Sequence, residues 1–288
     1  MRRVVAERDR LLAFKNDFPH PPGHFYSPIP DWPAVTREAA LPDSCAGIDL
    51  NDAAQLKLLR ALAPFHDEHP FDEDPRPGVR YFFRNKFYPT PDGIVLYCML
   101  RQLLPRRVIE VGSGFSSSVI LDTVADGTQL TFIEPRPERL RNLLLPHDRP
   151  TILEKPLQET SRSRFTELEA RDILFVDSSH VSKRGSEVNL LLFEILPSLR
   201  SDVYVHFHDV FWPFEYPLVW AGRKWAWNEA YLLRGFLQYN TEFEIALFPS
   251  YLEHRYHQAL AELLPLALER HPFSGPTVGG SSLWLRRR

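Results

Sequence analysis

The chain has 288 residues, 44% of them hydrophobic, so it is long enough for one large domain or two small ones with a substantial core. Its formal net charge of −3 and isoelectric point near 6.4 provide no basic field, which argues against nucleic-acid partners. The first residues are charged and lack the apolar region of a signal peptide, and no run of about 18 apolar residues occurs, so we expect no membrane span. The two cysteines, Cys45 and Cys98, cannot form a disulfide framework, which predicts a reducing, cytoplasmic location.

Residues 1–43 are rich in proline and aromatic side chains. Such a stretch cannot build its own core, so we expect it to cover the main domain; a disordered tail is the alternative. The apolar side chains that argue against disorder are Phe14, Phe18, Phe25, Tyr26 and Trp32. A helix is predicted to begin at Asn51 and Asp52 and to end near Pro64. We therefore divide the chain into an N-terminal extension with a helix, residues 1–80, and a main domain, residues 81–288.

Helices and strands alternate in the main domain. Asp92 is expected to be the N-cap of a helix over Ile94–Leu104 that Pro105 stops. Short apolar runs predict strands at Val108–Val111, Leu130–Ile133, Thr151–Glu154, Ile173–Val176, Val203–Phe207, Phe243–Phe248 and Ser282–Leu285. Helical periodicity predicts helices from Ser116 and over Glu138–Leu145, Ser186–Leu196, Asn228–Tyr239 and Tyr256–Leu268. This alternation predicts an α/β, Rossmann-like fold: a doubly wound, seven-stranded, mostly parallel sheet with helices on both faces.

A glycine turn follows the first of these strands. Gly112, Ser113 and Gly114 lie between the strand and the helix that starts near Ser116. The two glycines permit a tight turn and let a ligand approach the backbone, while the helix N-terminus offers free N–H groups to an anionic or carboxylate-bearing ligand. Glu134 follows the second strand about 20 residues later, where a carboxylate accepts hydrogen bonds from both hydroxyls of a ribose. The turn and Glu134 together predict a cofactor that contains adenosine.

Two further residues bear on the identity of that cofactor. A dinucleotide motif has a third glycine where this chain has Ser117. Glu110, two residues before the first glycine, would repel a pyrophosphate but could orient the ammonium of an amino-acid group, directly or through water. S-adenosylmethionine carries an ammonium, a carboxylate and a ribose, whereas NAD has no ammonium. The pattern therefore favours S-adenosylmethionine, and a glycine turn that binds nothing is the alternative.

Polar side chains also follow the fourth and fifth predicted strands. Asp177 and His180 come after the fourth strand, and His208 and Asp209 come after the fifth. Ligands bind outside the carboxyl ends of such strands, so we expect these four side chains to meet in one cleft. Asp177 and Asp209 could hold a divalent cation such as Mg²⁺, or His208 or His180 could act as a general base on a hydroxyl group. A histidine beside Asp209 weakens the Mg²⁺ hypothesis, because Mg²⁺ prefers oxygen ligands.

Structural roles are the alternatives at these positions. His206 alternates with apolar residues inside its strand and is expected to be a core histidine whose polar atoms are satisfied. His180 and His208 could simply fix loops, and the aspartates could cap turns. The aromatic run at residues 211–216 is expected to line a substrate cleft, and the aromatic residues of the helix after it are expected to be buried. Polar contacts to a substrate are predicted at Glu215, Tyr216, Arg223 and Asn228.

With these residues, the chain resembles the class I S-adenosylmethionine-dependent methyltransferases. More closely, it resembles the bacterial branch that groups with small-molecule O-methyltransferases in the methyltransferase domain 24 family. From about Tyr81 onward, the resemblance is carried by IEVGSGFSS, FIEPRPERL, ILFVDSSHVSKRGSEVN, VYVHFHDVFWPFEYP, WNEAYLLRGFLQYN and GGSSLWLR. FYSPIPD and IDLNDAAQLKLL resemble the N-terminal extension of that group. The implied fold is the sheet predicted above with its last strand antiparallel.

The resemblance also implies roles for individual residues. The glycine turn would contact the methionine end of the cofactor, Glu134 the ribose and the loop around Gln158 the adenine, with Asp177 near the sulfonium. The predicted cofactor-binding residues are Glu110, Gly112, Ser113, Gly114, Phe115, Ser116, Glu134, Pro135, Gln158, Asp177 and Ser178. The predicted catalytic residues are His208, Asp209 and His180. In metal-dependent relatives, acids after the fourth and fifth strands hold Mg²⁺; Asp177 and Asp209 match that pattern, but His208 departs from it.

The sequence therefore predicts an enzyme, a methyltransferase that uses S-adenosylmethionine to methylate an oxygen of a small molecule or a sugar-like metabolite. One alternative is a cofactor-binding or regulatory protein without catalysis. The other is an NAD-dependent oxidoreductase, which Ser117 and Glu110 disfavour. The sequence does not identify the methyl acceptor, and it leaves a homo-oligomer open.

Overall fold

The computed structural model describes residues 19–270 and 280–288, and the chain divides into two units. The smaller unit comprises Met1–Glu38 and Pro217–Ala226, and the larger comprises Ala39–Tyr216 and Trp227–Arg288. The predicted helix after Asn51 is present and belongs to the larger unit. The domain boundary at residue 80 stays a prediction.

The described part of the smaller unit contains two short helices, η1 (Trp32–Ala34) and α9 (Leu218–Gly222). The rings of Phe25 and Tyr26 contact each other, with 4.3 Å between their centroids, and both side chains are exposed. These two aromatic residues therefore do not contribute to a core. Phe14 and Phe18 lie outside the described residues, and the role of this stretch as a cover remains a prediction.

The larger unit is built on one sheet. Within the described ranges, seven strands are ordered β3-β2-β1-β4-β5-β7-β6. They are β1 (Arg107–Val111), β2 (Gln129–Ile133), β3 (Thr151–Leu153), β4 (Ile173–Val176), β5 (Tyr204–Phe207), β6 (Phe243–Leu247) and β7 (Leu283–Arg287). Neighbouring strands are parallel except at β7, which runs antiparallel to both β5 and β6. The predicted mostly parallel sheet with an antiparallel last strand is confirmed.

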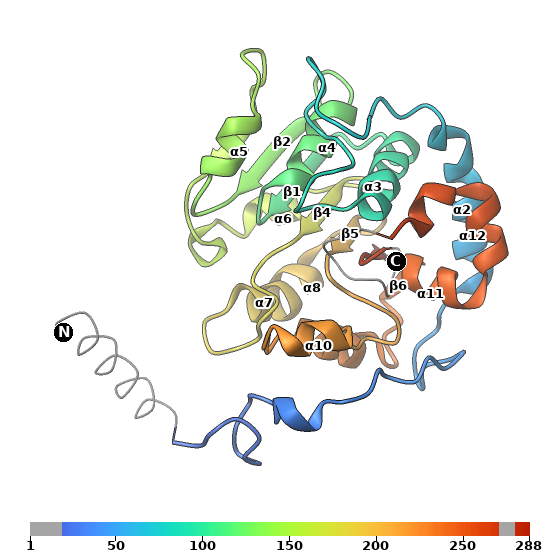
Figure 1. The fold of residues 1–288 in the computed structure, drawn as a ribbon. Coiled ribbons are helices and arrows are strands. Elements are labelled where there is room, and N and C mark those ends of the chain that lie inside the picture. The colour runs from blue at the N-terminus through green and yellow to red at the C-terminus, as the bar shows by residue number, and fades with distance from the viewer. Residues whose placement is uncertain (1–18, 271–279) are drawn as a thin grey trace, which may run out of the picture. The chain divides into compact units, whose positions relative to one another are not determined.

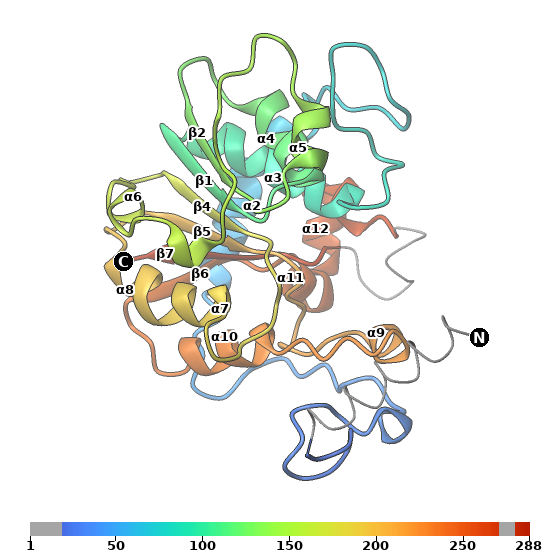
Figure 2. The same cartoon turned by 90° about the vertical axis from the view of Figure 1, so that its left-hand side faces the viewer.

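Helices cover both faces of this sheet, as expected for a doubly wound fold. Figures 1 and 2 show α3, α4 and α5 on one side and α7, α8 and α10 on the other. The first three are α3 (Thr90–Leu103), α4 (Phe115–Thr123) and α5 (Glu138–Leu143), and the others are α7 (Glu187–Leu190), α8 (Leu196–Ser198) and α10 (Glu229–Leu237). The other helical segments of this unit, within the residues that the structure describes, are α2 (Asp52–His66), η2 (Leu157–Glu159), α6 (Ser163–Thr166), η3 (Leu191–Ile195), α11 (Pro249–Arg255), α12 (His257–Leu263) and η4 (Pro265–Leu268). Helix α2 packs against α3, and α12 packs against α2.

The pairing register of β1 determines where the site forms. β1 is buried from its second residue onward, and Glu110 is its one charged side chain in that buried part. Glu110 pairs with Phe132 on β2 and with Phe175 on β4. The three strands therefore end level with one another, and the residues that follow them, including Glu134 and Asp177, lie at the same edge of the sheet.

Helix α2 ends at His66, close to Pro64, so its predicted approximate end is confirmed. The predicted start of α3 is wrong. Asp92 lies in the first turn of α3 and is not its N-cap, because the helix begins earlier, at Thr90, where Pro91 fits without needing an N–H partner. The buried carboxylate of Asp92 instead accepts hydrogen bonds from the backbone N–H and the hydroxyl of Ser281, at 2.9 and 2.8 Å.

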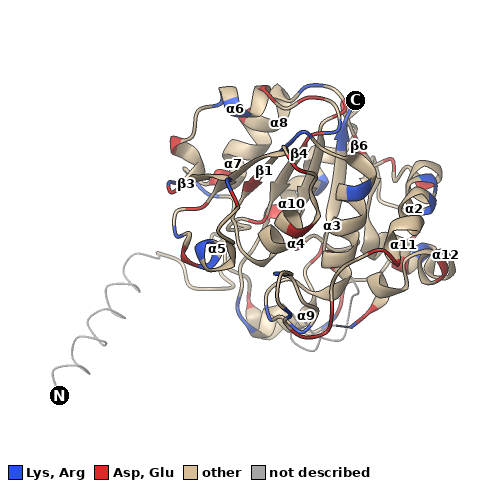
Figure 3. Ribbon diagram, turned by 90° about the horizontal axis from the view of Figure 1, so that it is seen from above, with Lys and Arg blue, Asp and Glu red and all other residues tan. Residues whose placement is uncertain are grey.

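Charges of both signs are distributed over the surface. Figure 3 shows Lys and Arg in blue interspersed with Asp and Glu in red over helices and loops.

A buried group of ion pairs also stabilises the larger unit: the guanidinium of Arg80 lies 2.5 Å from a carboxylate oxygen of Asp122 and 2.5 Å from one of Asp148. None of the helices within residues 19–270 and 280–288 combines the length and the apolarity that a membrane crossing requires.

Candidate active site

The glycine turn after β1 is fixed by a contact with the loop after β4. Gly112 has a φ of +81°, and a Cβ atom there would lie 1.7 Å from the backbone oxygen of Asp177. Gly112 is therefore required by its positive φ and by backbone packing, and the approach of a ligand to this turn stays a prediction. A Cβ atom on Gly114 would meet only the side chain of Arg139, at 3.4 Å, which is an ordinary contact. Gly114 is thus the position where the turn leaves room.

A buried network beneath the turn connects β1 to α4. The carboxylate of Glu110 accepts hydrogen bonds from the hydroxyls of Ser116, at 2.6 Å, and Ser117. The Ser117 oxygen in turn accepts the backbone N–H of Gly114 at 3.0 Å. Ser117, which stands where a dinucleotide motif has its third glycine, therefore connects the turn to Glu110 through hydrogen bonds. Burial raises the pKa of Glu110 to about 8, although the serine hydroxyls oppose that shift.

Glu134 lies beside this turn, at the end of β2. Its carboxylate accepts the backbone N–H of Ser113 at 3.3 Å and that of Arg136 at 2.8 Å. The side chain is partly exposed, so further acceptor positions remain open to a ligand. The structure therefore brings together the turn and the acid that the sequence singled out, although their contact with a ribose stays a prediction.

The other predicted cofactor residues surround this edge of the sheet. Phe115 begins α4, and its ring centroid lies 5.6 Å from that of Phe87. Gln158 belongs to η2, after β3, and its amide donates to the backbone oxygen of Gly185 at 2.8 Å. Pro135 follows Glu134 directly and is exposed. The hydroxyl oxygens of Ser113 and Ser178 are buried and have no hydrogen-bond partner among the described residues. These two unpartnered hydroxyls, one at the turn and one in the loop after β4, are what a polar ligand would satisfy.

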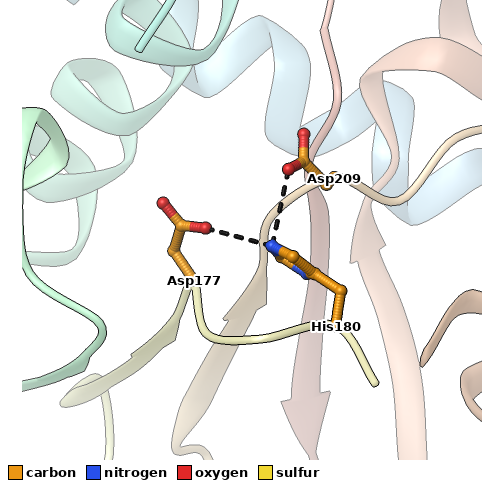
Figure 4. Close-up of side chains that lie close together, drawn as sticks. All are labelled: Asp177, His180 and Asp209. Atoms are coloured by element: carbon orange, nitrogen blue, oxygen red, sulfur yellow. Dashed lines mark ion pairs between the residues drawn. The ribbon is translucent and has the colours of Figure 1, made fainter. Parts of the chain in front are cut away.

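The loops after β4 and β5 bring three predicted residues together. Figure 4 shows the imidazole of His180 between the carboxylates of Asp177 and Asp209. The Nε2 atom of His180 lies 3.4 Å from Asp177 Oδ1 and 3.5 Å from Asp209 Oδ2. One ligand atom from each of the three side chains lies within 4.8 Å of the others, so the group could hold a metal ion. The predicted convergence of these side chains is thus present in the structure.

A residue that the sequence analysis did not select completes this cluster. Glu229, in the first turn of α10, has its Oε2 atom 2.9 Å from Nδ1 of His180. The backbone N–H groups of Asn228 and Glu229 also donate to the backbone oxygen of His180, at 3.0 and 3.2 Å. The Trp227 ring packs beside the imidazole, with 4.4 Å between ring centroids. The available signal was an acid directly after Asn228, at the start of a predicted helix that follows a site loop.

The surrounding carboxylates raise the pKa values of the two site histidines, His180 and His208. Burial alone would lower the pKa of His180, but hydrogen bonds with Asp177 and Glu229 raise it well above its ordinary value. His180 is therefore an imidazolium at neutral pH in the protein alone, which argues against its predicted role as a general base. Burial also opposes protonation of His208, but the carboxylates of Asp209, Asp177 and Asp92 together raise its pKa.

The carboxylates of the cluster have opposite pKa shifts. Burial would raise the pKa of Asp177, but the nearby His208 and His180 lower it. For Asp209, burial dominates and its pKa is raised despite the same two histidines. Asp177 is thus the carboxylate that stays ionised most readily. His206 is buried in the core as predicted, with its ring stacked on Phe175 at 3.9 Å, and burial lowers its pKa well below the ordinary value. The expectation that its polar atoms are satisfied is wrong, because neither ring nitrogen has a hydrogen-bond partner within the described residues.

Part of the aromatic run at residues 211–216, which we predicted to line a substrate cleft, is buried in the core instead. Trp212 and Phe214 are buried in the core, where the Phe214 ring lies 5.3 Å from that of Phe248. The Trp212 indole donates to the backbone oxygen of Pro42 at 2.8 Å. The prediction that residues 211–216 line a substrate cleft is therefore wrong for these two residues, because their large apolar rings fill space between the loop and the core. Of the predicted polar contacts, Arg223 belongs to the smaller unit.

Comparisons with known proteins agree with this organisation. A family model described as a methyltransferase domain matches residues 109–210. That range contains the glycine turn, Glu134 and the strand-end residues Asp177, His180 and Asp209. An uncharacterised protein of Archaeoglobus fulgidus is 32% identical over 162 residues, which are 52% of this chain and 73% of that protein.

Solved structures give a more distant likeness. A methyltransferase of Podospora anserina, solved with S-adenosylhomocysteine, is 17% identical with a TM-score of 0.42, over 68% of this chain and 77% of that one. An O-methyltransferase of Streptomyces achromogenes involved in tomaymycin synthesis, solved with S-adenosylmethionine, is 15% identical with a TM-score of 0.37, over 66% of this chain and 80% of that one. At such scores neither structure carries evidence about the chemistry of this chain. The family match carries the assignment for the part of the chain that it covers: residues 109–210 form a methyltransferase domain of the methyltransferase domain 24 family.

Proposed function

We propose that the protein transfers a methyl group from S-adenosylmethionine to an oxygen of a small molecule or a sugar-like metabolite. The observation that carries the proposal is the arrangement of two polar centres along one edge of the sheet. The glycine turn and Glu134 form the first centre, in hydrogen-bond contact with each other through Ser113. Asp177, His180 and Asp209 form the second, after the neighbouring strands β4 and β5. One centre suits a nucleoside with an amino-acid group, and the other suits the oxygen that receives the methyl group.

The residues present fit this cofactor. Gly114 leaves room at the N-terminus of α4, and Glu134 has a partly exposed carboxylate. The hydroxyls of Ser113 at the turn and of Ser178 in the loop after β4 lack partners in the described chain. When bound, S-adenosylmethionine supplies an electrophilic methyl group. The turn would hold its methionine end, Glu134 its ribose, and η2 around Gln158 its adenine. Catalysis is then mainly the alignment of the acceptor oxygen with that methyl group.

His208 is the candidate base. His180 is already held as an imidazolium between carboxylates. The pKa of His208 is also raised, but not well above its ordinary value, and its buried Nδ1 atom has no partner within the described residues. His208 would take the proton of the acceptor hydroxyl as the new carbon–oxygen bond forms. Asp209, whose Oδ1 atom lies 3.6 Å from His208 Nε2, would stabilise the resulting imidazolium. His180 and Glu229 would fix the loop that presents Asp177.

A divalent cation is the second candidate at the same cluster. Two carboxylates and an imidazole nitrogen within 4.8 Å of one another are a suitable donor set. The hydrogen bond between His180 Nδ1 and Glu229 would fix the tautomer that leaves Nε2 free for the ion. Because one donor is nitrogen, the set favours Mn²⁺, Fe²⁺ or Zn²⁺ over the Mg²⁺ that we predicted. Such an ion would orient the acceptor oxygen and lower the pKa of its hydroxyl group.

Calorimetric titration tests the proposal. The protein is titrated with S-adenosylhomocysteine and with NAD, each with Mg²⁺, with Mn²⁺ and with a chelator. Micromolar binding of S-adenosylhomocysteine alone is expected, and a screen of hydroxyl compounds for transfer of a radiolabelled methyl group then identifies the acceptor. Binding of NAD instead would indicate an oxidoreductase. Cofactor binding with no acceptor in a broad screen would favour a regulatory protein, and binding of neither would refute the cofactor site.

A further inference from the structure

Tyr88 is held rigidly at the entrance of α3, next to the second polar centre. Its backbone N–H donates to the side-chain oxygen of Asn85 at 2.7 Å, and its backbone oxygen accepts the Asn85 amide at 2.7 Å. The hydroxyl of Tyr81 donates to the same backbone oxygen at 2.9 Å. The centroid of the Tyr88 ring lies 5.0 Å from that of His208 and 6.3 Å from that of Phe175. The ring is therefore positioned by the protein before any ligand binds.

The hydroxyl of Tyr88 has no use within the protein. The side chain is 1% exposed, and its Oη atom makes no hydrogen bond with any part of the chain that the structure describes. A buried polar group without a partner destabilises the folded state, so its presence calls for an explanation. Phenylalanine would fill the same space without that cost. A ligand that supplies the missing partner is such an explanation.

The charges around the hydroxyl indicate the kind of ligand. The carboxylates of Asp92, Asp177 and Glu110 all lie within electrostatic reach of it. Asp177 faces His180, and both oxygens of Glu110 already accept serine hydroxyls. Burial raises the pKa of Tyr88 well above its ordinary value, so the hydroxyl stays neutral, and its oxygen can accept a hydrogen bond. A neutral acceptor surrounded by carboxylates, one of them at the glycine turn, suits an ammonium group.

We propose that Tyr88 recognises the amino-acid end of S-adenosylmethionine, with its Oη atom accepting a hydrogen bond from the ammonium group. This inference rests on the proposed function. Asp177, whose pKa is lowered, provides the negative charge near the turn, Glu110 becomes a carboxylate when the ammonium binds, and Tyr88 provides the direct contact. Tyr88 is then a binding residue that connects the start of α3 to the cofactor.

The test is the variant Tyr88→Phe, which removes only the hydroxyl oxygen. Its affinity is measured by calorimetry for two probes, S-adenosylhomocysteine and 5′-methylthioadenosine, which shares the adenosine and the thioether but has no amino-acid end. We expect S-adenosylhomocysteine to bind at least about ten-fold more weakly to the variant, as a hydrogen bond to a charged group is lost. Binding of 5′-methylthioadenosine is expected to be unchanged. The melting temperature without ligand is expected to be equal to that of the wild type or higher.

Tyr97→Phe is the matched control. The Tyr97 hydroxyl is partnered, donating to the backbone oxygen of Glu68 at 2.9 Å, so this variant should be less stable and bind both probes normally. Equal affinity of wild type and Tyr88→Phe for S-adenosylhomocysteine would overturn the inference and leave the proposed function intact. So would an equal loss for both probes, or a lower melting temperature of Tyr88→Phe without ligand. A wild-type protein that binds neither probe would refute the proposed function, and the inference with it.

Discussion

His180 Nδ1 lies 2.9 Å from Glu229 Oε2, and the two residues, 49 positions apart in the sequence, are both buried. This pair attaches the start of α10 to the loop after β4. Because Asp177 and Asp209 lie on the other side of the imidazole, His180 is the cation between three carboxylates. The histidine that the sequence offered as a base is therefore, in the protein alone, the group that neutralises the site.

The first prediction concerns the pH dependence of this pair. The pKa of His180 is raised in the folded protein, so its protonation stabilises the fold fully below its ordinary pKa of 6.5. That stabilisation is lost as the pH rises through the folded-state pKa, which lies well above 6.5. Glu229→Gln lowers the folded-state pKa, and we expect it to cost about 1–3 kcal/mol of unfolding free energy at neutral pH.

Urea unfolding at a series of pH values from about 6 to 9 measures this effect. The loss of stability on going to higher pH should be smaller in Glu229→Gln and should be complete at a lower pH than in the wild type. Glu154→Gln is the control, because Glu154 pairs with Arg141 at the surface, and its profile should match that of the wild type. Superimposable profiles for wild type and Glu229→Gln would show that the pair does not set the protonation of His180.

The second prediction concerns Gly112. Gly112→Ala places a Cβ atom 1.7 Å from the Asp177 backbone oxygen, so the two loops of the site must separate. We expect a loss of unfolding free energy of about 4 kcal/mol or more, together with loss of ligand binding. Gly127→Ala is a matched control, because Gly127 also has a positive φ, +88°, but no atom lies within 4 Å of its Cβ position. That control should cost only about 1–2 kcal/mol, and an equal cost for both variants would contradict the role of the contact.

Local signals predicted the strands well and the contacts between them poorly. β4 begins and ends at the predicted residues, because a short buried run of apolar residues is a local pattern. Ser186 caps α7 by accepting the N–H of Asn189, which is also a local arrangement. Gly112, in contrast, must be glycine because the backbone oxygen of Asp177, in the loop after another strand, lies where a Cβ atom would be. No spacing within the turn contains that information.

In the candidate site, too, some residues could be predicted from local patterns and others only from the three-dimensional fold. Asp177, His180 and Asp209 could be predicted to converge because parallel strands end at one edge. Glu229 could not, because α10 follows a segment that belongs to the other unit, and the helix docks on His180 only in three dimensions. The protonation state of His180 could not be predicted from the sequence either, because it depends on carboxylates from three different segments of the chain.

The third prediction concerns the ribose contact. Glu134→Gln should weaken binding of S-adenosylhomocysteine at least about ten-fold, because the carboxylate can accept hydrogen bonds from both ribose hydroxyls and the amide oxygen only poorly replaces it. Calorimetry of the variant measures the loss. Stability should change little, since Glu134 is partly exposed and its carboxylate binds only backbone N–H groups of Ser113 and Arg136. Unchanged affinity would remove the ribose assignment.

The fourth prediction concerns the base. His208→Ala should lower turnover at least about ten-fold while affinity for S-adenosylhomocysteine holds, because only the proton transfer is lost. Radiolabelled methyl transfer at saturating cofactor measures it, once an acceptor has been found. His254→Ala is the control, since His254 lies in α11, pairs with the exposed Asp43 and makes no hydrogen bond or ion pair with the cluster within the described residues, and should keep full turnover. Normal turnover of His208→Ala would assign the proton to another acceptor, such as a bound cation with hydroxide.

The last prediction is that binding of the cofactor product releases a proton from Glu110. Burial raises the pKa of Glu110 to about 8, so in the protein alone the carboxyl group is mostly protonated at neutral pH. An ammonium group nearby favours the carboxylate, so binding should release up to about one proton and strengthen as the pH rises toward 8. Calorimetry in two buffers of different ionisation enthalpy detects the proton as a difference in the observed heat. The difference should vanish for Glu110→Gln and for 5′-methylthioadenosine, which has no ammonium group. Equal heats in both buffers for the wild type would mean that the ammonium binds out of reach of Glu110, and the orientation of the cofactor on the glycine turn would have to be reversed.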